Sequence, residues 1–341
     1  MPLKPLLALV LLAATTHAQT VRMVPVDKDV QLEVLDWGGT GRPLILLTGL
    51  GNTAHIYDDF APKLSQYHVY AITRRGFGAS SVPETGYSVD RLADDVLAVL
   101  DALSIPKPIV AGHSIAGEEL SSIATRHPER VAGLIYLDAA LSFAFYSPEL
   151  GDMNIDSLVL QRRLHELSTQ PPQPLPIVSE LLTTDLPAYE RDLREFQRRF
   201  AEHPPPPTNP NRHDPTPADR ATFAAYRLWQ ARTDNMLFPE SELRQQFTAN
   251  PDGSVGHYKN HATVVQAIVN GEQKFTHLGN VRMLAIYAMD PGHGKEAQSA
   301  AFEKANPTAP VVRLKNANHY IFLSNEADVL RAMNDFIATL P

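Results

Sequence analysis

Short runs of apolar residues recur along the chain, and segments with helical periodicity separate them. The run at residues 44–47, Leu-Ile-Leu-Leu, is uninterrupted, as expected for a strand buried on both faces of a parallel sheet. After Ser88, a residue suited to capping a helix, apolar side chains follow at helical spacing. The expected strands are 30–37, 44–47, 69–73, 108–111, 132–137, 282–288 and 310–314. This alternation predicts an α/β fold, with helices on both faces of a mostly parallel central sheet.

The segment at residues 139–280 breaks this rhythm. It has helical patterns and many aromatic residues but no buried-strand run, and its prolines are typical of rigid connectors. We therefore predict a mainly helical insertion here. The α/β core then consists of residues 19–138 and 281–341.

The first residues have the pattern of an export signal. Lys4 precedes an apolar run at residues 6–14 that is too short to span a bilayer, and Thr16-His17-Ala18 offers small residues for cleavage. We predict a signal peptide over residues 1–18 and a secreted or periplasmic mature protein. No later stretch reaches the length of a membrane span, so no stable membrane insertion is expected after cleavage.

Composition narrows the classes of function. The chain has 341 residues, no cysteine and a formal net charge of −8, and it lacks a basic block. Disulfides and cysteine-based zinc sites are thereby excluded, and nothing supports binding to nucleic acid. The pattern leaves the oligomeric state open.

A serine lies in a tight turn after the expected strand at 108–111. The sequence there reads Val-Ala-Gly-His-Ser-Ile-Ala-Gly, and a helical pattern begins directly behind Ser114. Gly112 permits a sharp turn, small neighbours keep the serine accessible, and the helix directs its N-terminal dipole at the site. A second serine in similar company, Ser254, has no strand before it. Strand, serine turn and helix together predict a nucleophile.

These residues resemble the α/β-hydrolase superfamily, in its carboxylesterase-like branch with a serine nucleophile and an inserted cap. The turn departs from the usual G-x-S-x-G pattern, because Ala116 stands where the second glycine is usual. The resemblance implies the chain order serine, acid, histidine. It also implies that the base is His319, which follows the last expected strand.

Two aspartates compete to orient this base. Asp290 follows the expected strand at 282–288 and is the commoner location in the resembled family. Asp138 follows the strand at 132–137 and is the alternative acid. The resemblance further implies an oxyanion hole formed by the backbone N–H groups of Leu50 and Ile115.

The resulting hypothesis is a serine hydrolase that cleaves small to medium hydrophobic carboxylic esters through an acyl-enzyme on Ser114. The expected partner is a small-molecule ester, and neither a cofactor nor a metal is required. His257 and His261 share a helical spacing, but a third metal ligand is missing nearby. A lactonase, an amide or peptide hydrolase, or a carbon–carbon bond hydrolase would use the same residues. A non-catalytic ligand-binding protein on this fold is the alternative from another class.

Overall fold

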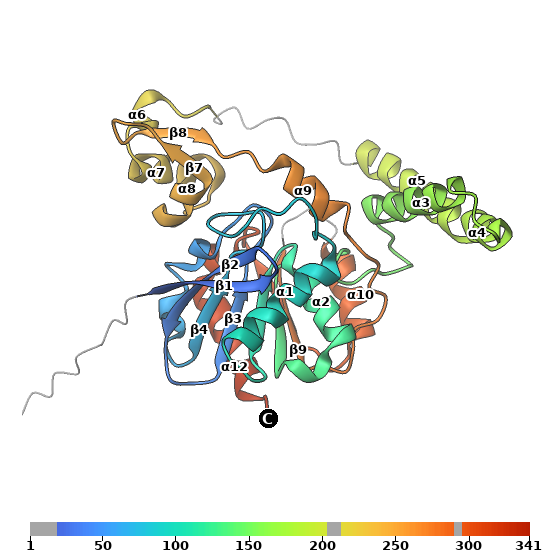
Figure 1. Cartoon of the computed structure of the whole chain (residues 1–341), viewed down its shortest axis with the longest axis horizontal. Coiled ribbons are helices and arrows are strands. Elements are labelled where there is room, and N and C mark those ends of the chain that lie inside the picture. The colour runs from blue at the N-terminus through green and yellow to red at the C-terminus, as the bar shows by residue number, and fades with distance from the viewer. Residues whose placement is uncertain (1–18, 203–212, 290–294) are drawn as a thin grey trace, which may run out of the picture.

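The central sheet defines the architecture of this computed structural model, which describes residues 19–202, 213–289 and 295–341. Eight strands lie in the order β1-β2-β4-β3-β5-β6-β9-β10 (Figure 1). The pairs β1–β2 and β2–β4 are antiparallel and every other pair is parallel. The strands are β1 (Thr20–Asp27), β2 (Val30–Gly38), β3 (Pro43–Leu47), β4 (His68–Ile72), β5 (Ile109–His113), β6 (Gly133–Leu137), β9 (Met283–Met289) and β10 (Val311–Lys315). The prediction of a mostly parallel α/β sheet is confirmed.

Helices cover both faces of this sheet. Alternate side chains of β3 enter two separate cores, Leu44 and Leu46 in one and Ile45 and Leu47 in the other. The second core includes side chains of α1, α2 and α10, and the first includes side chains of α11 and α12. Their bounds are α1 (Val89–Ala102), α2 (Ala116–Arg126), α10 (Lys295–Ala305), α11 (Ile321–Ser324) and α12 (Glu326–Ala338). Burial on both faces explains why the central strands read as continuous apolar runs.

The edge strand β1 is absent from the sequence prediction. It pairs only with β2, and most of its side chains are exposed. An exposed edge strand needs no apolar run, so it leaves little hydrophobic signal in the sequence. The predicted signal peptide at residues 1–18 lies outside the described residues.

The segment between β6 and β9 forms two lobes and a helix between them (Figure 1). One lobe, here called the α3–α5 lobe, contains α3 (Met153–Ser168), α4 (Pro174–Glu180), η4 (Leu181–Asp185) and α5 (Leu186–Glu202). The other contains α6 (Pro217–Arg220), α7 (Phe223–Asp234), α8 (Glu240–Gln246), β7 (Phe247–Ala249) and β8 (Val255–Tyr258). The helix α9 (Ala262–Val269) lies between the lobes, above the core. The short β7–β8 hairpin is missing from the sequence prediction, because its strands are too short to show a period.

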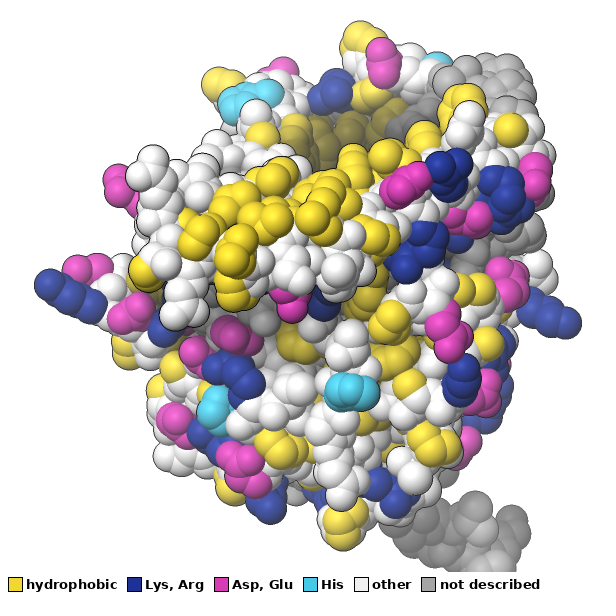
Figure 2. Space-filling model, turned by 90° about the vertical axis from the view of Figure 1, so that its right-hand side faces the viewer, with side chains coloured by type: hydrophobic (Ala, Val, Ile, Leu, Met, Phe, Trp, Pro, Cys, Tyr) yellow, Lys and Arg dark blue, Asp and Glu magenta, His cyan; other side chains and the backbone are white. Residues whose placement is uncertain are grey.

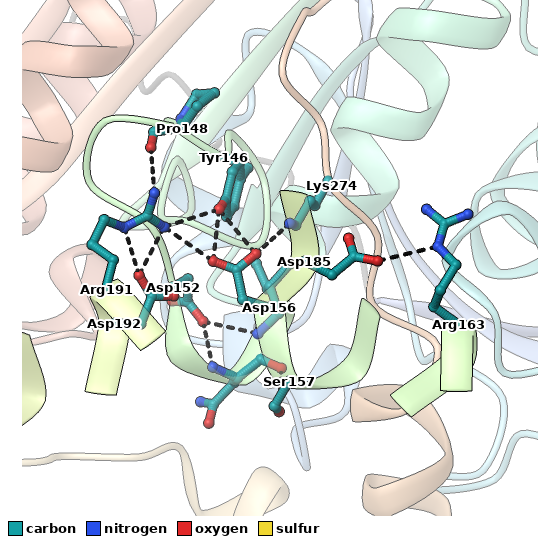
Figure 3. A network of polar contacts seen from close by, with 12 residues as sticks. Tyr146, Pro148, Asp152, Asp156, Ser157, Arg163, Asp185, Arg191, Asp192 and Lys274 are labelled. Carbon is teal, nitrogen blue, oxygen red and sulfur yellow. Dashed lines mark hydrogen bonds and ion pairs between the residues drawn. The ribbon is translucent and has the colours of Figure 1, made fainter. Parts of the chain in front are cut away.

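A buried polar network joins the helices of the α3–α5 lobe (Figure 3). Asp156 of α3 accepts a hydrogen bond from Tyr146 at 2.7 Å and forms ion pairs with Lys274 and with Arg191 of α5. Arg191 also pairs with Asp192 at 2.8 Å. Burial and the neighbouring Asp156 raise the pKa of Asp192 to about 6. The network thus connects α3 and α5 with Tyr146, in the segment that leads from β6 into the lobe, and with Lys274, in the segment that leads from α9 to β9.

The outer face of the same lobe is apolar. Figure 2 looks onto it and shows a band of hydrophobic side chains across its surface. The exposed large hydrophobic side chains of this lobe are Leu164, Leu175, Leu182, Leu186, Leu193, Phe196 and Phe200. The lobe thus combines polar anchoring at its base with a hydrophobic surface facing away from the sheet.

Candidate active site

Ser114 lies in the turn between β5 and α2, where the sequence predicted it. Its φ angle is +54°, in the left-handed region that a serine rarely adopts. A Cβ on Gly117 would lie 2.1 Å from the backbone oxygen of Ala139, and a Cβ on Gly112 would lie 3.0 Å from the Cβ of Ala116. The small residues of the motif therefore allow α2 to pack closely behind a strained turn that presents the serine at the end of the sheet.

His319 follows β10 and forms a hydrogen bond with an aspartate at the end of β6. The distance from its Nδ1 to Oδ2 of Asp138 is 2.7 Å. Asp138 is wholly buried, and its other carboxylate oxygen accepts the backbone N–H of Ala288 at 2.9 Å. The parallel register, with Leu137 opposite Ile286, places the end of β6 beside β9 and within reach of the loop after β10.

Of the two candidate acids, the alternative, Asp138, is the one bonded to His319 within the described residues. Asp290 itself lies outside the described residues. The physical reason is the left-handed φ of +47° at Asp138, which ends the strand in a turn beside β9, where its carboxylate meets the imidazole. Sequence position alone did not separate the two strand ends.

Lys295 is a further neighbour of Asp138 that the sequence reading missed. Its Nζ lies 2.7 Å from Oδ2 of Asp138, the oxygen that also contacts His319. Burial acts to raise the pKa of Asp138, but the hydrogen bond from His319 and the charge of Lys295 outweigh it. The pKa therefore falls below its usual value, and Asp138 is ionised.

His113, the last residue of β5, packs against His319. Its Nε2 donates to the backbone oxygen of His319 at 3.0 Å, and the two rings lie 4.6 Å apart. Burial, followed by the proximity of His319, lowers the pKa of His113 to about 3, so it is neutral. Gly49 completes the packing, because a Cβ there would lie 2.7 Å from Nδ1 of His113.

The loop that carries Leu50 is held by a buried ion pair. Arg74 donates to the backbone oxygen of Thr48 at 2.9 Å and binds Glu119 through two hydrogen bonds, at 2.7 and 2.8 Å. Arg74 and Glu119 are far apart in the sequence, so this contact has no local sequence signal. Within the described residues, no hydrogen bond from the backbone N–H of Leu50 or Ile115 is found. Both groups are therefore available to an incoming oxyanion.

Apolar side chains surround these two N–H groups. Leu50 and Ile115 belong to one hydrophobic cluster with Phe77, Phe143 and residues of α9. The contributions of α9 are Val264, Val265, Ala267 and Ile268. The segment inserted between β6 and β9 thus supplies part of the wall beside the serine.

Two buried carboxyl groups near this wall had no sequence signal. Glu118 of α2 is 1% exposed, and neither of its carboxyl oxygens has a hydrogen-bond partner within the described residues. Burial, together with nearby Glu272, raises the pKa of Glu118 well above its usual value. Burial and Asp152 also raise the pKa of Glu272, to about 7. Burial therefore favours the protonated form of Glu118 over the carboxylate.

Of the remaining candidates, His261 directly precedes α9 and packs against Phe77, with ring centroids 5.2 Å apart, whereas Ser254 and His257 lie in the lobe of α6–α8. Ser254 sits in the turn between β7 and β8, where its hydroxyl donates to Asp252 at 2.7 Å. His257 bonds to Thr248 at 3.1 Å. The part of the chain that the structure describes holds no group of three His, Asp or Glu residues placed to bind a metal. Likewise, no helix in these residues is long and apolar enough to cross a bilayer.

The chain is similar in sequence to a known protein family and to several curated proteins. The family model described as the alpha/beta hydrolase fold matches residues 42–326. A putative non-heme haloperoxidase of Mycobacterium phage D29 is 39% identical over 104 residues, 30% of this chain and 37% of that protein. The 3-oxoadipate enol-lactonase 2 of Acinetobacter baylyi is 35% identical over 115 residues, 33% of this chain and 43% of that enzyme. The chain thus spans less than half the length of these curated relatives.

Solved structures resemble the chain over almost its whole length. E-2-(acetamidomethylene)succinate hydrolase has a TM-score of 0.64 at 17% identity, covering 94% of this chain and 100% of its own. A thermophilic esterase from Thermogutta terrifontis has a TM-score of 0.54 at 17% identity, covering 94% and 98%. At such low identity these likenesses support the fold alone.

Proposed function

Since the chain belongs to the α/β-hydrolase family, we propose that it is a serine hydrolase that cleaves carboxylic esters of small to medium hydrophobic substrates. The curated relatives include hydrolases, which supports the broad class. The observation that carries the proposal is the 2.7 Å hydrogen bond between His319 and Asp138, at the end of the sheet where the strained turn presents Ser114.

The proposed reaction is acyl transfer to water. Ser114 attacks the ester carbonyl while His319 accepts the hydroxyl proton, and Asp138 holds the imidazole in the tautomer with the proton on Nδ1. The N–H groups of Leu50 and Ile115 stabilise the oxyanion. His319 then protonates the leaving alcohol and activates a water that hydrolyses the acyl-enzyme. The mechanism uses no cofactor.

The apolar surroundings support a hydrophobic substrate. Phe77, Phe143 and α9 lie in one cluster with the proposed oxyanion donors. We assign the segment 139–280 the role of a cap whose helix α9 contacts the acyl group. Export through the signal at residues 1–18 remains part of the proposal, with a secreted or periplasmic enzyme as its result.

A lactonase is the second candidate. It is favoured by the similarity to the enol-lactonase of Acinetobacter baylyi, which is 35% identical over the matched residues. A lactone is a cyclic ester, so the same nucleophile, base and oxyanion donors would open it. Amide and carbon–carbon bond hydrolysis would also use this set of residues.

Hydrolysis of p-nitrophenyl esters with acyl chains of two, four, eight and twelve carbons tests the proposal. We expect turnover by the protein and loss of turnover in Ser114→Ala. Ser254→Ala is the matched control, since this serine lies in a surface turn and should leave the activity unchanged. The chain-length optimum would measure the acyl site.

The same assay can overturn the proposal. Activity that survives in Ser114→Ala would mean that another residue is the nucleophile. A protein that is inactive on all four esters but opens aliphatic lactones would replace the esterase by the lactonase. The absence of both activities would refute hydrolysis of carboxylic esters.

A further inference from the structure

Lys295, the first residue of α10, contacts the carboxylate of the proposed triad. We propose that Lys295 is a positioning residue that orients Asp138 and offsets part of the negative charge that this carboxylate presents to His319. This inference rests on the proposed function, because it concerns the base of the same site. It adds a cation to a constellation that usually contains only serine, histidine and an acid.

The geometry places the ammonium and the imidazole on one oxygen atom. Lys295 Nζ and His319 Nδ1 each lie 2.7 Å from Oδ2 of Asp138. The opposite oxygen, Oδ1, accepts the N–H of Ala288 at 2.9 Å. Three donors on three elements therefore fix the carboxylate, and rotation about its side chain would break all three contacts.

The ion pair is shielded from water. The side chain of Lys295 is 11% exposed and that of Asp138 is 0% exposed. A surface ion pair contributes little, but a charge in such surroundings acts strongly on its neighbours. The charge of Lys295 therefore acts on His319 with little screening.

Lys295 is the first residue of α10, and a lysine at this position does not stabilise the helix itself. The N-terminal end of a helix carries partial positive charge, so a cation there is unfavourable unless another group compensates. Burying the ammonium adds a desolvation cost. Asp138 is the group that offsets both, so the position of Lys295 is explained by its contact with the triad acid.

The consequence for His319 follows from the sum of the nearby charges. An ionised carboxylate alone stabilises the imidazolium and thereby favours protonation. A cation on the same carboxylate oxygen offsets part of this effect. Removing the cation would therefore favour the imidazolium, which cannot accept the serine proton.

Among the described residues, the histidine and the tyrosines near the imidazole are neutral. Burial lowers the pKa of His113 to about 3 and raises the pKa of Tyr320 to about 12, and it raises that of Tyr287 well above its usual value. Asp290 and His293 precede α10 but lie outside the described residues. Within the described residues, the charged groups at the imidazole are Asp138 and Lys295.

The first test is a pH titration of the His319 ring by NMR, with the signal assigned from a His319→Gln variant. In Lys295→Met we expect the midpoint of protonation to rise by about one pH unit, the smallest shift typical of a charge at this range. Lys295→Gln removes the charge but keeps a donor, so it should show the same rise and serves if the Met variant does not fold. Lys295→Arg should keep the original midpoint.

Lys304→Met is the matched control. Lys304 belongs to the same helix, but its side chain is 75% exposed and pairs with the exposed Glu149. This variant should titrate like the unmodified protein. An unchanged midpoint in both Lys295→Met and Lys295→Gln would overturn the proposal.

Kinetics give a second readout on p-nitrophenyl ester substrates. The acid limb of kcat/KM should move to higher pH in Lys295→Met, leaving roughly one tenth of the activity at a pH well below the midpoint. A uniform loss at every pH, without a shift of the limb, would indicate a structural role and contradict the inference. The NMR titration needs no substrate, so it tests Lys295 even if ester hydrolysis itself fails.

Discussion

Replacing Asp138 with asparagine is the most informative change to this site. The substitution keeps the size of the side chain but removes the charge from a group that is bonded to His319, Lys295 and the N–H of Ala288. The amide can present its NH2 group to Nδ1 of His319, which selects the wrong tautomer of the imidazole. In a serine protease triad the corresponding change lowers kcat by about 10⁴-fold, and we expect a loss of the same order here.

The structure also predicts a cost in stability. Asp138 is wholly buried, and in the asparagine variant the ammonium of Lys295 loses its counter-ion. Removing one partner of a buried ion pair typically costs about 3–5 kcal/mol, a large share of the roughly 5–15 kcal/mol that stabilises a folded domain. The double variant Asp138→Asn, Lys295→Met should recover much of this stability, because no buried charge is left unpaired. It should recover none of the activity.

Two assays separate these effects. Urea unfolding compares the free energy of unfolding of the three proteins, and ester hydrolysis at saturating substrate compares kcat. Asp290→Asn is the control for the choice of acid and should keep its activity within about threefold, on the scale of a residue outside a triad. The reasoning would be refuted if Asp138→Asn retained full activity while Asp290→Asn lost it, since Asp290 would then be the acid.

Three further predictions concern the turn, the buried acid and the oxyanion loop. Gly117→Ala should destabilise the fold by at least about 3 kcal/mol, because its Cβ would lie 2.1 Å from a backbone oxygen of Ala139; chemical denaturation would measure this. Since the folded-state pKa of Glu118 is raised, its stabilising contribution is present at low pH and is lost as pH rises through the normal range of a carboxyl group. Glu118→Gln should therefore stabilise the protein more at pH 8 than at pH 4, and equal effects in urea unfolding at both would contradict this. Arg74→Met should lower kcat about 10- to 100-fold by loosening the loop of Leu50, while Arg244→Met, at an exposed i,i+4 pair, should leave kcat unchanged.

Several elements could be predicted from the sequence because their signal is local. The uninterrupted run Leu44–Ile45–Leu46–Leu47 indicates a strand buried on both faces, and β3 is found there. Ser114 lies in the predicted turn, and His319 follows the last strand as expected. In each case the residues that carry the pattern are adjacent in the chain, so the physical requirement appears directly in their order.

Other features have no local signal. β1 is an exposed edge strand that is held in the sheet by its pairing with β2. The strands of the β7–β8 hairpin are too short to show periodicity. The pair Arg74–Glu119 joins the loop after β4 to the start of α2, so neither residue alone indicates the contact. The same is true of Glu118, whose raised pKa depends on burial and on Glu272, which is far away in the chain.

The sequence by itself determined the buried strands and the serine turn, since apolar runs and tight turns are properties of neighbouring residues, and the family resemblance added the position of the histidine. Only the tertiary structure decided which aspartate contacts His319. Asp138 and Asp290 both follow strands, and the contact depends on strand register and on the backbone turn at Asp138. The structure alone also placed Lys295 on the same carboxylate, because α10 meets the end of β6 only after the chain has folded. Electrostatics depends on distance and burial, and neither can be read from the order of the residues.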